Sequence, residues 1–322
     1  MDRVARGSAK EDCPQEGHKL MDTEVLVAGF LAAAVRVATP LLLAATGETI
    51  TERSGVINLG LEGTMLAGAL AATLGATAWG PWSGVGCAIV AGMLLAAVFA
   101  LLAVGARADQ IITDTAITLA AVGLTGTIYR QVYGSGGAGL TIPTLKSVAI
   151  PGLSEIPVLG PALFDQPAPT YLALLAMPIV WWVLFRTRLG LALRATGEGA
   201  AMARAAGVRT HLIRSGATIV GGGFAGLAGA SLVLAQVGSF AEGMTAGRGY
   251  VAIAIVVLGR WHPAGIALGA LLFGAATALQ FLLQTMGLNA PYQLFLMLPY
   301  LLTLLALAGA VGRVRAPADL GR

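Results

Sequence analysis

Charged residues are scarce in this chain. Only 11% of its 322 residues are Asp, Glu, Lys or Arg, whereas soluble domains carry about 25%. This shortage excludes an ordinary water-soluble fold. The formal net charge of +4 is also small, so nothing points to a nucleic-acid partner, and we relate the positive charge to membrane topology instead.

Cysteine, histidine and lysine are equally rare, which excludes several kinds of site. The two cysteines, Cys13 and Cys87, form neither a CxxC pair nor a disulfide framework. The three histidines lack the spacing of metal ligands: His18, His211 and His262. None of the three lysines completes a Walker A motif, which excludes ATP hydrolysis by that route: Lys10, Lys19 and Lys146.

Motifs of soluble catalysis are missing or misplaced. No serine stands in a GxSxG elbow, and no nucleophile triad can be drawn. GxGxxG matches occur at 134–139 and 221–226, but neither stands between a strand and a helix, as a dinucleotide site requires. In the second match, Gly222 and Gly226 have the small-xxx-small spacing of close helix contacts. We therefore expect no catalytic residue, metal or cofactor in this chain.

Long apolar runs take the place of the missing charge. Runs of about 20 residues recur along most of the chain, and each can cross a bilayer as a helix. They are too continuous for the alternating strands of a barrel. The sequence predicts an all-α, polytopic transmembrane bundle of nine segments, of which the first runs into an acidic stretch and the seventh is short: 25–46, 56–78, 84–105, 110–129, 170–185, 213–236, 248–259, 264–284 and 292–311.

Arginine placement predicts the orientation. Arginines crowd residues 186–214, which marks this loop as cytoplasmic. Counting spans outward then makes the N-terminus external and the C-terminus cytoplasmic. We expect a disordered polar leader at 1–23, a membrane domain at 24–312 and a cytoplasmic tail at 313–322. Met21 is an alternative start.

The longest external loop is expected at residues 130–169. It contains GSGGAG and five prolines. Two interpretations remain open. The loop covers the outer mouth or contacts an external partner, or it is a solvated connector.

Three acids, Glu48, Glu52 and Glu62, interrupt the first two apolar segments. An ionised side chain at the centre of a lipid-facing helix costs about 2.5–3.5 kcal/mol, so these acids do not face lipid. Three roles remain open for Glu62: a structural hydrogen bond to a neighbouring helix, contact with a solute, and proton coupling. Asp109 and Asp114 begin the fourth segment, where carboxylates favour a helix N-terminus.

The residues around these acids predict a helix break near the cytoplasmic surface. Gly55, Gly60 and Gly63 weaken the helix. Ser54 and Asn58 can bond the backbone groups that a break leaves free.

The basic loop predicts a cytoplasmic helix of about ten residues. Thr196 is the expected N-cap, with Glu198 in the first turn. Arg204 lies in the last turn, and Gly207 stands at the left-handed C-cap position. The residues between are small, which favours docking into a groove of another protein over a surface helix with bulky apolar residues or a plain linker.

Three segments carry a resemblance to a known family. LRATGEGAAMARAAGV (193–208) resembles the cytoplasmic coupling-helix motif of permease subunits of bacterial ABC importers. SGVINLGLEGTMLAGALAA (54–72) and GRGYVAIAIVVLGRWHPAG (247–265) are similar to the branched-chain amino acid and ribose permease superfamily. Within it, ERSGVINLGLEG (52–63) resembles the simple-sugar and nucleoside group.

The resemblance implies a permease subunit in the bacterial plasma membrane, working by alternating access. Its partners would be a second, related permease chain, two cytoplasmic ATPase subunits that bind ATP and Mg, an external solute-binding protein and membrane lipid. A nucleoside is the first choice of solute, followed by a pentose or another simple sugar. The residues expected to couple to the ATPase are Arg194, Thr196, Gly197, Glu198, Met202, Arg204 and Gly207. Those expected on the translocation pathway are Asn58, Glu62 and Glu48.

The main alternative is a proton-coupled secondary transporter that uses Glu48, Glu62 or Asp114 as the titrating carboxylate. The two halves of the chain show no obvious inverted repeat, which weakens this alternative. A membrane enzyme is a third alternative, weakened by the missing catalytic constellation.

Overall fold

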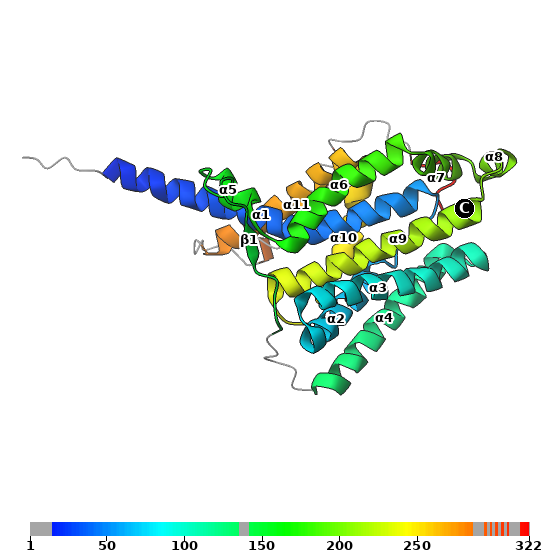
Figure 1. Ribbon diagram of the computed structural model, residues 1–322, viewed down its shortest axis with the longest axis horizontal. Helices are drawn as coiled ribbons and strands as arrows, with labels where there is room; N and C mark the ends of the chain where they lie inside the picture. The colour runs from blue at the N-terminus through cyan, green and yellow to red at the C-terminus, as the bar shows by residue number, and fades with distance from the viewer. Residues whose placement is uncertain are drawn as a thin grey trace, which may run out of the picture.

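The computed structural model describes residues 15–134, 142–285 and 316–321, together with single helical positions between 293 and 308. Within these residues the chain is a helical bundle with one two-stranded sheet (Figure 1). The elements are α1 (Gln15–Arg53), α2 (Leu61–Trp79), α3 (Pro81–Ala100), η1 (Leu101–Gly105), α4 (Gln110–Tyr133), β1 (Ser147–Ala149), α5 (Leu159–Leu163), β2 (Asp165–Pro167), α6 (Ala168–Arg186), α7 (Arg188–Glu198), α8 (Ala200–Ala205), α9 (Thr210–Ser231), η2 (Leu232–Val237), α10 (Arg248–Leu258) and α11 (Pro263–Thr285).

Six of the described helical stretches are long and apolar enough to cross a membrane: Glu24–Arg53, Pro81–Gly105, Gln110–Tyr133, Ala168–Arg186, Thr210–Val237 and Pro263–Thr285. The predicted second and seventh segments fold as α2 and the short apolar helix α10, which are not among these six. The ninth, residues 292–311, lies largely outside the described residues. The multi-pass, helical membrane organisation is therefore confirmed, while nine crossings remain a prediction.

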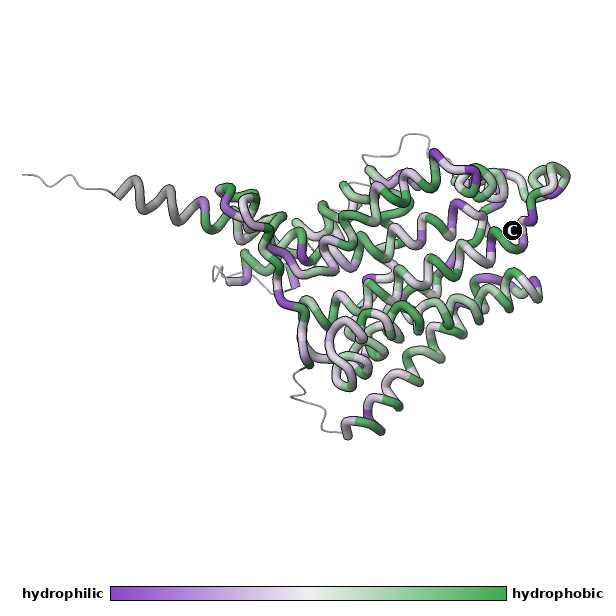
Figure 2. Tube along the Cα trace, viewed as in Figure 1, coloured by the Kyte–Doolittle hydropathy of each residue, from purple (hydrophilic) through white to green (hydrophobic). Residues whose placement is uncertain are grey.

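Large apolar side chains cover the outside of the bundle. Leu101 of η1 is 70% exposed, and Leu119 of α4 is 68% exposed. Figure 2 shows hydrophobic residues along the lengths of the helices, with many of the hydrophilic ones near the two ends of the bundle. Soluble monomers rarely expose so large an apolar surface. Lipid or another membrane subunit must cover it.

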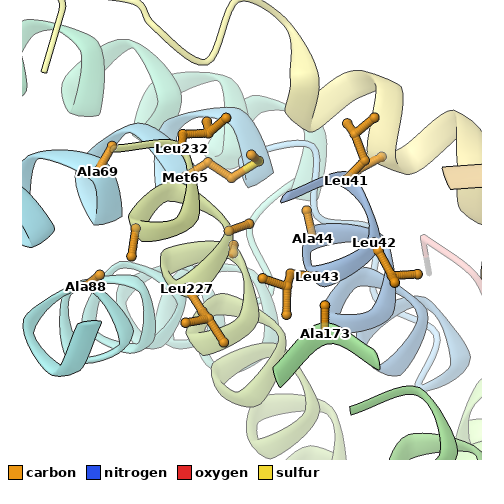
Figure 3. Packing of buried hydrophobic residues seen from close by; sticks show 14 of the residues in the cluster. Leu41, Leu42, Leu43, Ala44, Met65, Ala69, Ala88, Ala173, Leu227 and Leu232 are labelled. Carbon is orange, nitrogen blue, oxygen red and sulfur yellow. The ribbon is translucent and has the colours of Figure 1, made fainter. Parts of the chain in front are cut away.

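Small residues bring α2, α3 and α9 into close contact. A Cβ added to Gly68 would lie 2.5 Å from the Cα of Gly226, and one added to Gly222 would lie 2.6 Å from the carbonyl oxygen of Gly92. The spacing of Gly222 and Gly226 predicts such a contact, and the structure confirms it. Aliphatic side chains from α1, α2, α6 and α9 fill the neighbouring space (Figure 3).

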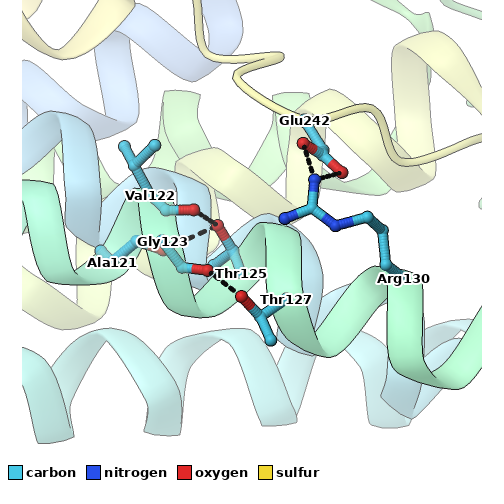
Figure 4. A network of polar contacts seen from close by, with 7 residues as sticks. All are labelled: Ala121, Val122, Gly123, Thr125, Thr127, Arg130 and Glu242. Atoms are coloured by element: carbon cyan, nitrogen blue, oxygen red, sulfur yellow. Dashed lines mark hydrogen bonds and ion pairs between the residues drawn. The ribbon is translucent and has the colours of Figure 1, made fainter. Parts of the chain in front are cut away.

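The two ends of the bundle differ. At one end, β1 and β2 pair antiparallel, with Ser147 opposite Pro167, close to α5 (Figure 1). Near the C-terminal end of α4, Arg130 forms an ion pair with Glu242, which precedes α10, at 2.9 Å (Figure 4). The opposite end holds α7, α8 and the C-terminal end of the chain (Figure 1).

Two residues of the predicted external loop pack against the bundle, while most of its described part is exposed. Ile142 and Leu145 are buried, and their N–H groups donate to the carbonyls of Gly238 and Leu234 at 3.1 and 2.8 Å. Residues 135–141, with most of the glycine-rich run, lie outside the described residues.

The predicted leader and tail are each described only in part. Residues 1–14 of the leader lie outside the described residues, whereas residues 15–23 continue α1 as helix. Residues 313–315 of the tail also lie outside them, and residues 316–321 are described.

Candidate functional site

The predicted helix break is confirmed between α1 and α2. α1 ends at Arg53 and α2 begins at Leu61, with irregular backbone over residues 54–60. Gly55 has a φ of +91°, a left-handed conformation that favours glycine. Its N–H donates to the carbonyl of Glu52 at 2.9 Å. The chain therefore turns sharply at this point and starts a new helix after Gly60.

Two buried carboxylates accept hydrogen bonds from the backbone of this break. The N–H of Asn58 donates to Oε1 of Glu48 at 3.2 Å, and the N–H of Leu59 donates to Oδ2 of Asp114 at 2.7 Å. Glu48, Asp114 and Asn58 are only 0%, 1% and 3% exposed. Among the described residues, Oε2 of Glu48, Oδ1 of Asp114 and Nδ2 of Asn58 find no hydrogen-bond partner. The break thus holds both acceptors and a donor with unused bonding capacity.

Glu62, in the first turn of α2, binds the start of α10. Its Oε1 accepts from the N–H of Gly247 and its Oε2 from the N–H of Gly249, both at 2.7 Å. Gly249 lies so close that an added Cβ would be 2.6 Å from the Cα of Glu62. Both oxygens are therefore engaged on the α10 side. Of the three roles open for Glu62, this geometry supports the structural hydrogen bond.

The last residues of α1 bind the turn between α10 and α11. The indole N–H of Trp261 donates to Oε2 of Glu52. Arg53 donates from Nε and Nη2 to the carbonyl oxygen of Trp261, at 3.1 and 3.0 Å. Glu52 and Trp261 are 3% and 4% exposed. One tryptophan thereby anchors two consecutive charged residues beside the break.

The two aspartates of α4 differ in role. Asp109 caps the helix, because its Oδ1 accepts from the N–H of Ile112 at 3.0 Å. Asp114 lies a turn further along and is buried against the break, although the sequence groups it with Asp109 at the helix start. The available signal for this role was an aspartate inside an otherwise apolar helix. The sequence could not identify its partner, because Leu59 is 55 residues away.

The basic loop is helical, but its first helix begins earlier than predicted. Thr187 caps α7, with its Oγ accepting from the N–H of Gly190 at 3.1 Å. Thr196 is therefore not an N-cap. It lies inside α7 and donates to the carbonyl of Ala192 at 2.8 Å, and Glu198 is the last residue of α7 instead of lying in a first turn. The expected N-cap was wrong because an upstream cap had already started the helix.

The C-terminal cap of the short helix α8 is confirmed. Gly207 has a φ of +86°, and its N–H donates to the carbonyl of Arg204 at 2.9 Å. The N–H of Val208 donates to the carbonyl of Ala203, also at 2.9 Å. These paired bonds form a Schellman cap. Met202 is 76% exposed, so α8 offers an apolar side chain to the surroundings.

The junction between α7 and α8 lies directly against the helix break. A Cβ added to Gly197 would overlap the carbonyl oxygen of Arg53, and one added to Gly55 would lie 3.4 Å from the Cα of Gly197. Arg194, one turn before, stacks its guanidinium 5.1 Å from the ring centre of Phe185. The structure therefore joins Gly197 to the break and leaves Met202 and Arg204 exposed on α8.

Within the part of the chain that the structure describes, no group of three or more His, Cys, Asp or Glu side chains could hold a metal ion.

Comparisons with known proteins agree over most of the chain. Residues 30–307 match the family described as the permease component of branched-chain amino acid transport systems. The "Putative glucose ABC transporter permease protein TsgC13" of Haloferax volcanii is 41% identical over 312 residues, 90% of this chain and 93% of that protein.

Two further relatives are named for nucleosides. The guanosine ABC transporter permease protein NupQ of Bacillus subtilis is 35% identical over 309 residues, covering 92% of this chain and 96% of its own. The nucleoside ABC transporter permease protein NupC of Lactococcus lactis is 33% identical over 304 residues, covering 91% and 94%. No solved structure matches the chain.

Proposed function

We infer a nucleoside as the solute of this chain, which belongs to the family of permease components of branched-chain amino acid transport systems. It is a multi-pass membrane subunit of an ABC transporter and not the ATPase itself. The alignments with the guanosine and nucleoside permeases, each over nine-tenths of the chain, carry the choice of solute. The relative named for glucose keeps a simple sugar, a pentose included, as the second choice.

The coupling role is assigned to the α7–α8 region. Subunits of the ATPase, which bind ATP and Mg, dock on α8 around the exposed Met202 and Arg204. The Schellman cap at Gly207 fixes where α8 ends, and Gly197 joins the docking site to the helix break. Arg194 ties α7 to Phe185 of α6, and Thr196 and Glu198 lie in the last turn of α7, next to the docking site. Movement of the ATPase subunits then reaches the membrane helices through this region.

The break between α1 and α2 is assigned to the solute pathway. Glu48 and Asn58 carry a carboxylate oxygen and an amide nitrogen without partners, and Asp114 joins them although the sequence did not place it there. Buried polar atoms without partners are costly, and the hydroxyl groups and ring nitrogens of a nucleoside supply the bonds that these atoms lack. Glu62 acts beside the pathway by holding the start of α10.

The further partners follow from the family and the surface. A second permease chain, related to this one, covers part of the exposed apolar surface, and lipid covers the rest. A solute-binding protein delivers the nucleoside on the side of β1 and α5. That side is external if the arginine-rich end with α7 and α8 faces the cytoplasm, which places the N-terminus outside.

Uptake by the complete transporter tests the solute. The full complex is reconstituted with its binding protein in vesicles loaded with ATP, and uptake of labelled guanosine and labelled glucose is compared. We expect guanosine uptake that excess unlabelled nucleoside abolishes and excess glucose does not. Glucose uptake with no guanosine uptake would reverse the assignment.

Vesicles that hold the permease chains without the ATPase subunits address the energy source. The proton-coupled alternative requires uptake driven by a pH gradient in these vesicles. We expect none, because the chain belongs to a family of ABC permeases.

A further inference from the structure

The described end of the C-terminal tail, residues 316–321, lies between α8 and the helix break. The N–H of Ala200, the first residue of α8, donates to Oδ2 of Asp319 at 2.6 Å. The N–H of Asp319 donates in turn to the carbonyl of Gly197 at 2.9 Å. Two residues on, the N–H of Gly321 donates to the carbonyl of Gly55 at 3.1 Å. A six-residue stretch therefore contacts both elements at once.

Asp319 supplies the hydrogen-bond acceptor that the N-terminus of α8 lacks in its own sequence. The N-cap position of α8 is Gly199, which has no side chain to accept a hydrogen bond. The N–H groups of a first helical turn need an acceptor, and a carboxylate there also interacts favourably with the helix dipole. Asp319 provides both from 119 residues away.

The tail also contacts the helix break, through Gly55. Gly55, which accepts the bond from Gly321, stands three residues before Asn58. The backbone N–H of Asn58 binds the buried carboxylate of Glu48. The guanidinium of Arg214, in the first turns of α9, donates to the carbonyl of Ser54 at 3.3 Å. The tail, α9 and the α7–α8 junction thus meet the break within a few residues of the buried acids.

We propose that the C-terminal tail is a coupling element, with Asp319 as a positioning residue that clamps the start of α8 to the break between α1 and α2. A displacement of α8 then moves Gly55 through the tail as well as through Gly197. The break, with Asn58 and Glu48 attached, shifts together with α8. This inference rests on the proposed docking of the ATPase at α8.

A pair of substitutions at Asp319 tests the clamp. Asp319→Ala removes the acceptor, whereas Asp319→Asn keeps an oxygen that can accept from Ala200. Each variant is placed in the full transporter with its ATPase and binding protein, and solute uptake is measured per ATP hydrolysed. A lost N-cap acceptor typically shifts a helix equilibrium about fivefold. We therefore expect Asp319→Ala to lower the ratio about fivefold, and Asp319→Asn to restore most of it.

Two controls distinguish loss of the clamp from failed assembly and from a general effect of a substitution. Thr127→Ala, at an exposed position of α4 where the hydroxyl donates to the carbonyl of Gly123 in the same helix, should leave the ratio unchanged. Equal co-purification of the ATPase with wild type and Asp319→Ala shows that the complex assembles. A wild-type ratio in Asp319→Ala overturns the clamp. If Gly207→Val, which breaks the cap of α8, also leaves the ratio unchanged, the proposed docking at α8 fails as well.

Discussion

Gly197 and the carbonyl oxygen of Arg53 approach so closely that no side chain fits between them. We expect Gly197→Ala to push the α7–α8 junction away from the break, because backbone atoms cannot give way as a flexible side chain can. Overpacking of this kind costs about 1–3 kcal/mol. The thermal midpoint of the detergent-solubilised complex should fall, and transport should fall further than ATP hydrolysis. Gly216→Ala, in α9, is the matched control, since a Cβ there would meet nothing within 4 Å.

The left-handed conformation of Gly207 leads to a second prediction. A β-branched residue at a φ of +86° costs roughly 1–2 kcal/mol, so Gly207→Val should unravel the end of α8. ATP hydrolysis by the complex should continue while uptake falls, and the yield of inserted protein should stay normal. Glu198→Arg should also lower uptake, because it replaces the acid that interacts favourably with Arg53 by a further cation beside Arg53 and Arg194. Normal uptake in both variants would contradict the docking role.

Replacement of Glu62 distinguishes its structural role from a charge-dependent one. In Glu62→Gln one carboxylate oxygen becomes an NH₂ donor, which faces the N–H of Gly247 or Gly249. The variant loses one buried hydrogen bond and gains an unpaired donor. Together these should lower the free energy of unfolding by about 1–3 kcal/mol. We expect a lower thermal midpoint with partial transport, and a larger loss in Glu62→Ala. Glu242→Gln, at an exposed ion pair, should change stability by less than about 1 kcal/mol. A wild-type thermal midpoint with no transport in Glu62→Gln would point to the charge instead.

The hydrogen bond from Trp261 to Glu52 can be measured by a double-mutant cycle. Trp261→Phe keeps an aromatic ring but removes the indole donor, which leaves a buried carboxylate without this partner. The loss should be about 1–3 kcal/mol. In a Glu52→Leu background the same change should cost much less, because no carboxylate remains to be stranded. Additive losses would show that the two side chains do not act as a pair.

We predict that Glu48 contacts the solute and takes no part in ATP hydrolysis or in binding of the ATPase subunits. Glu48→Gln retains the size of the side chain and an oxygen that can accept from Asn58. We expect guanosine uptake to fall while ATP hydrolysis and ATPase binding stay near wild type. The KM for guanosine uptake should rise. Unchanged uptake kinetics would remove Glu48 from the pathway.

Local features of the sequence anticipated the local features of the structure. The glycines between Ser54 and Gly63 predicted the helix break, Gly207 predicted a left-handed cap, and Asp109 predicted a helix start. Each of these features has a signal in a short stretch of neighbouring residues, so the local sequence was enough to predict it.

Features that depend on residues outside the motif itself could not be predicted from the sequence. Thr196 has the properties of an N-cap, but Thr187 starts the helix first. Asp114 and Trp261 gain their roles only when helices far apart in the chain come together. The cap of α8 comes from Asp319, which no spacing rule connects to Ala200.

The close contact of α2, α3 and α9 restricts how the transporter can move. Where glycines of three helices touch with no space for a methyl group, rotation or sliding of one helix against another would force backbone atoms together. We expect these three helices to move together as one rigid block during transport. The inward and outward states then differ at the joints around the block, and the irregular residues 54–60 form such a joint.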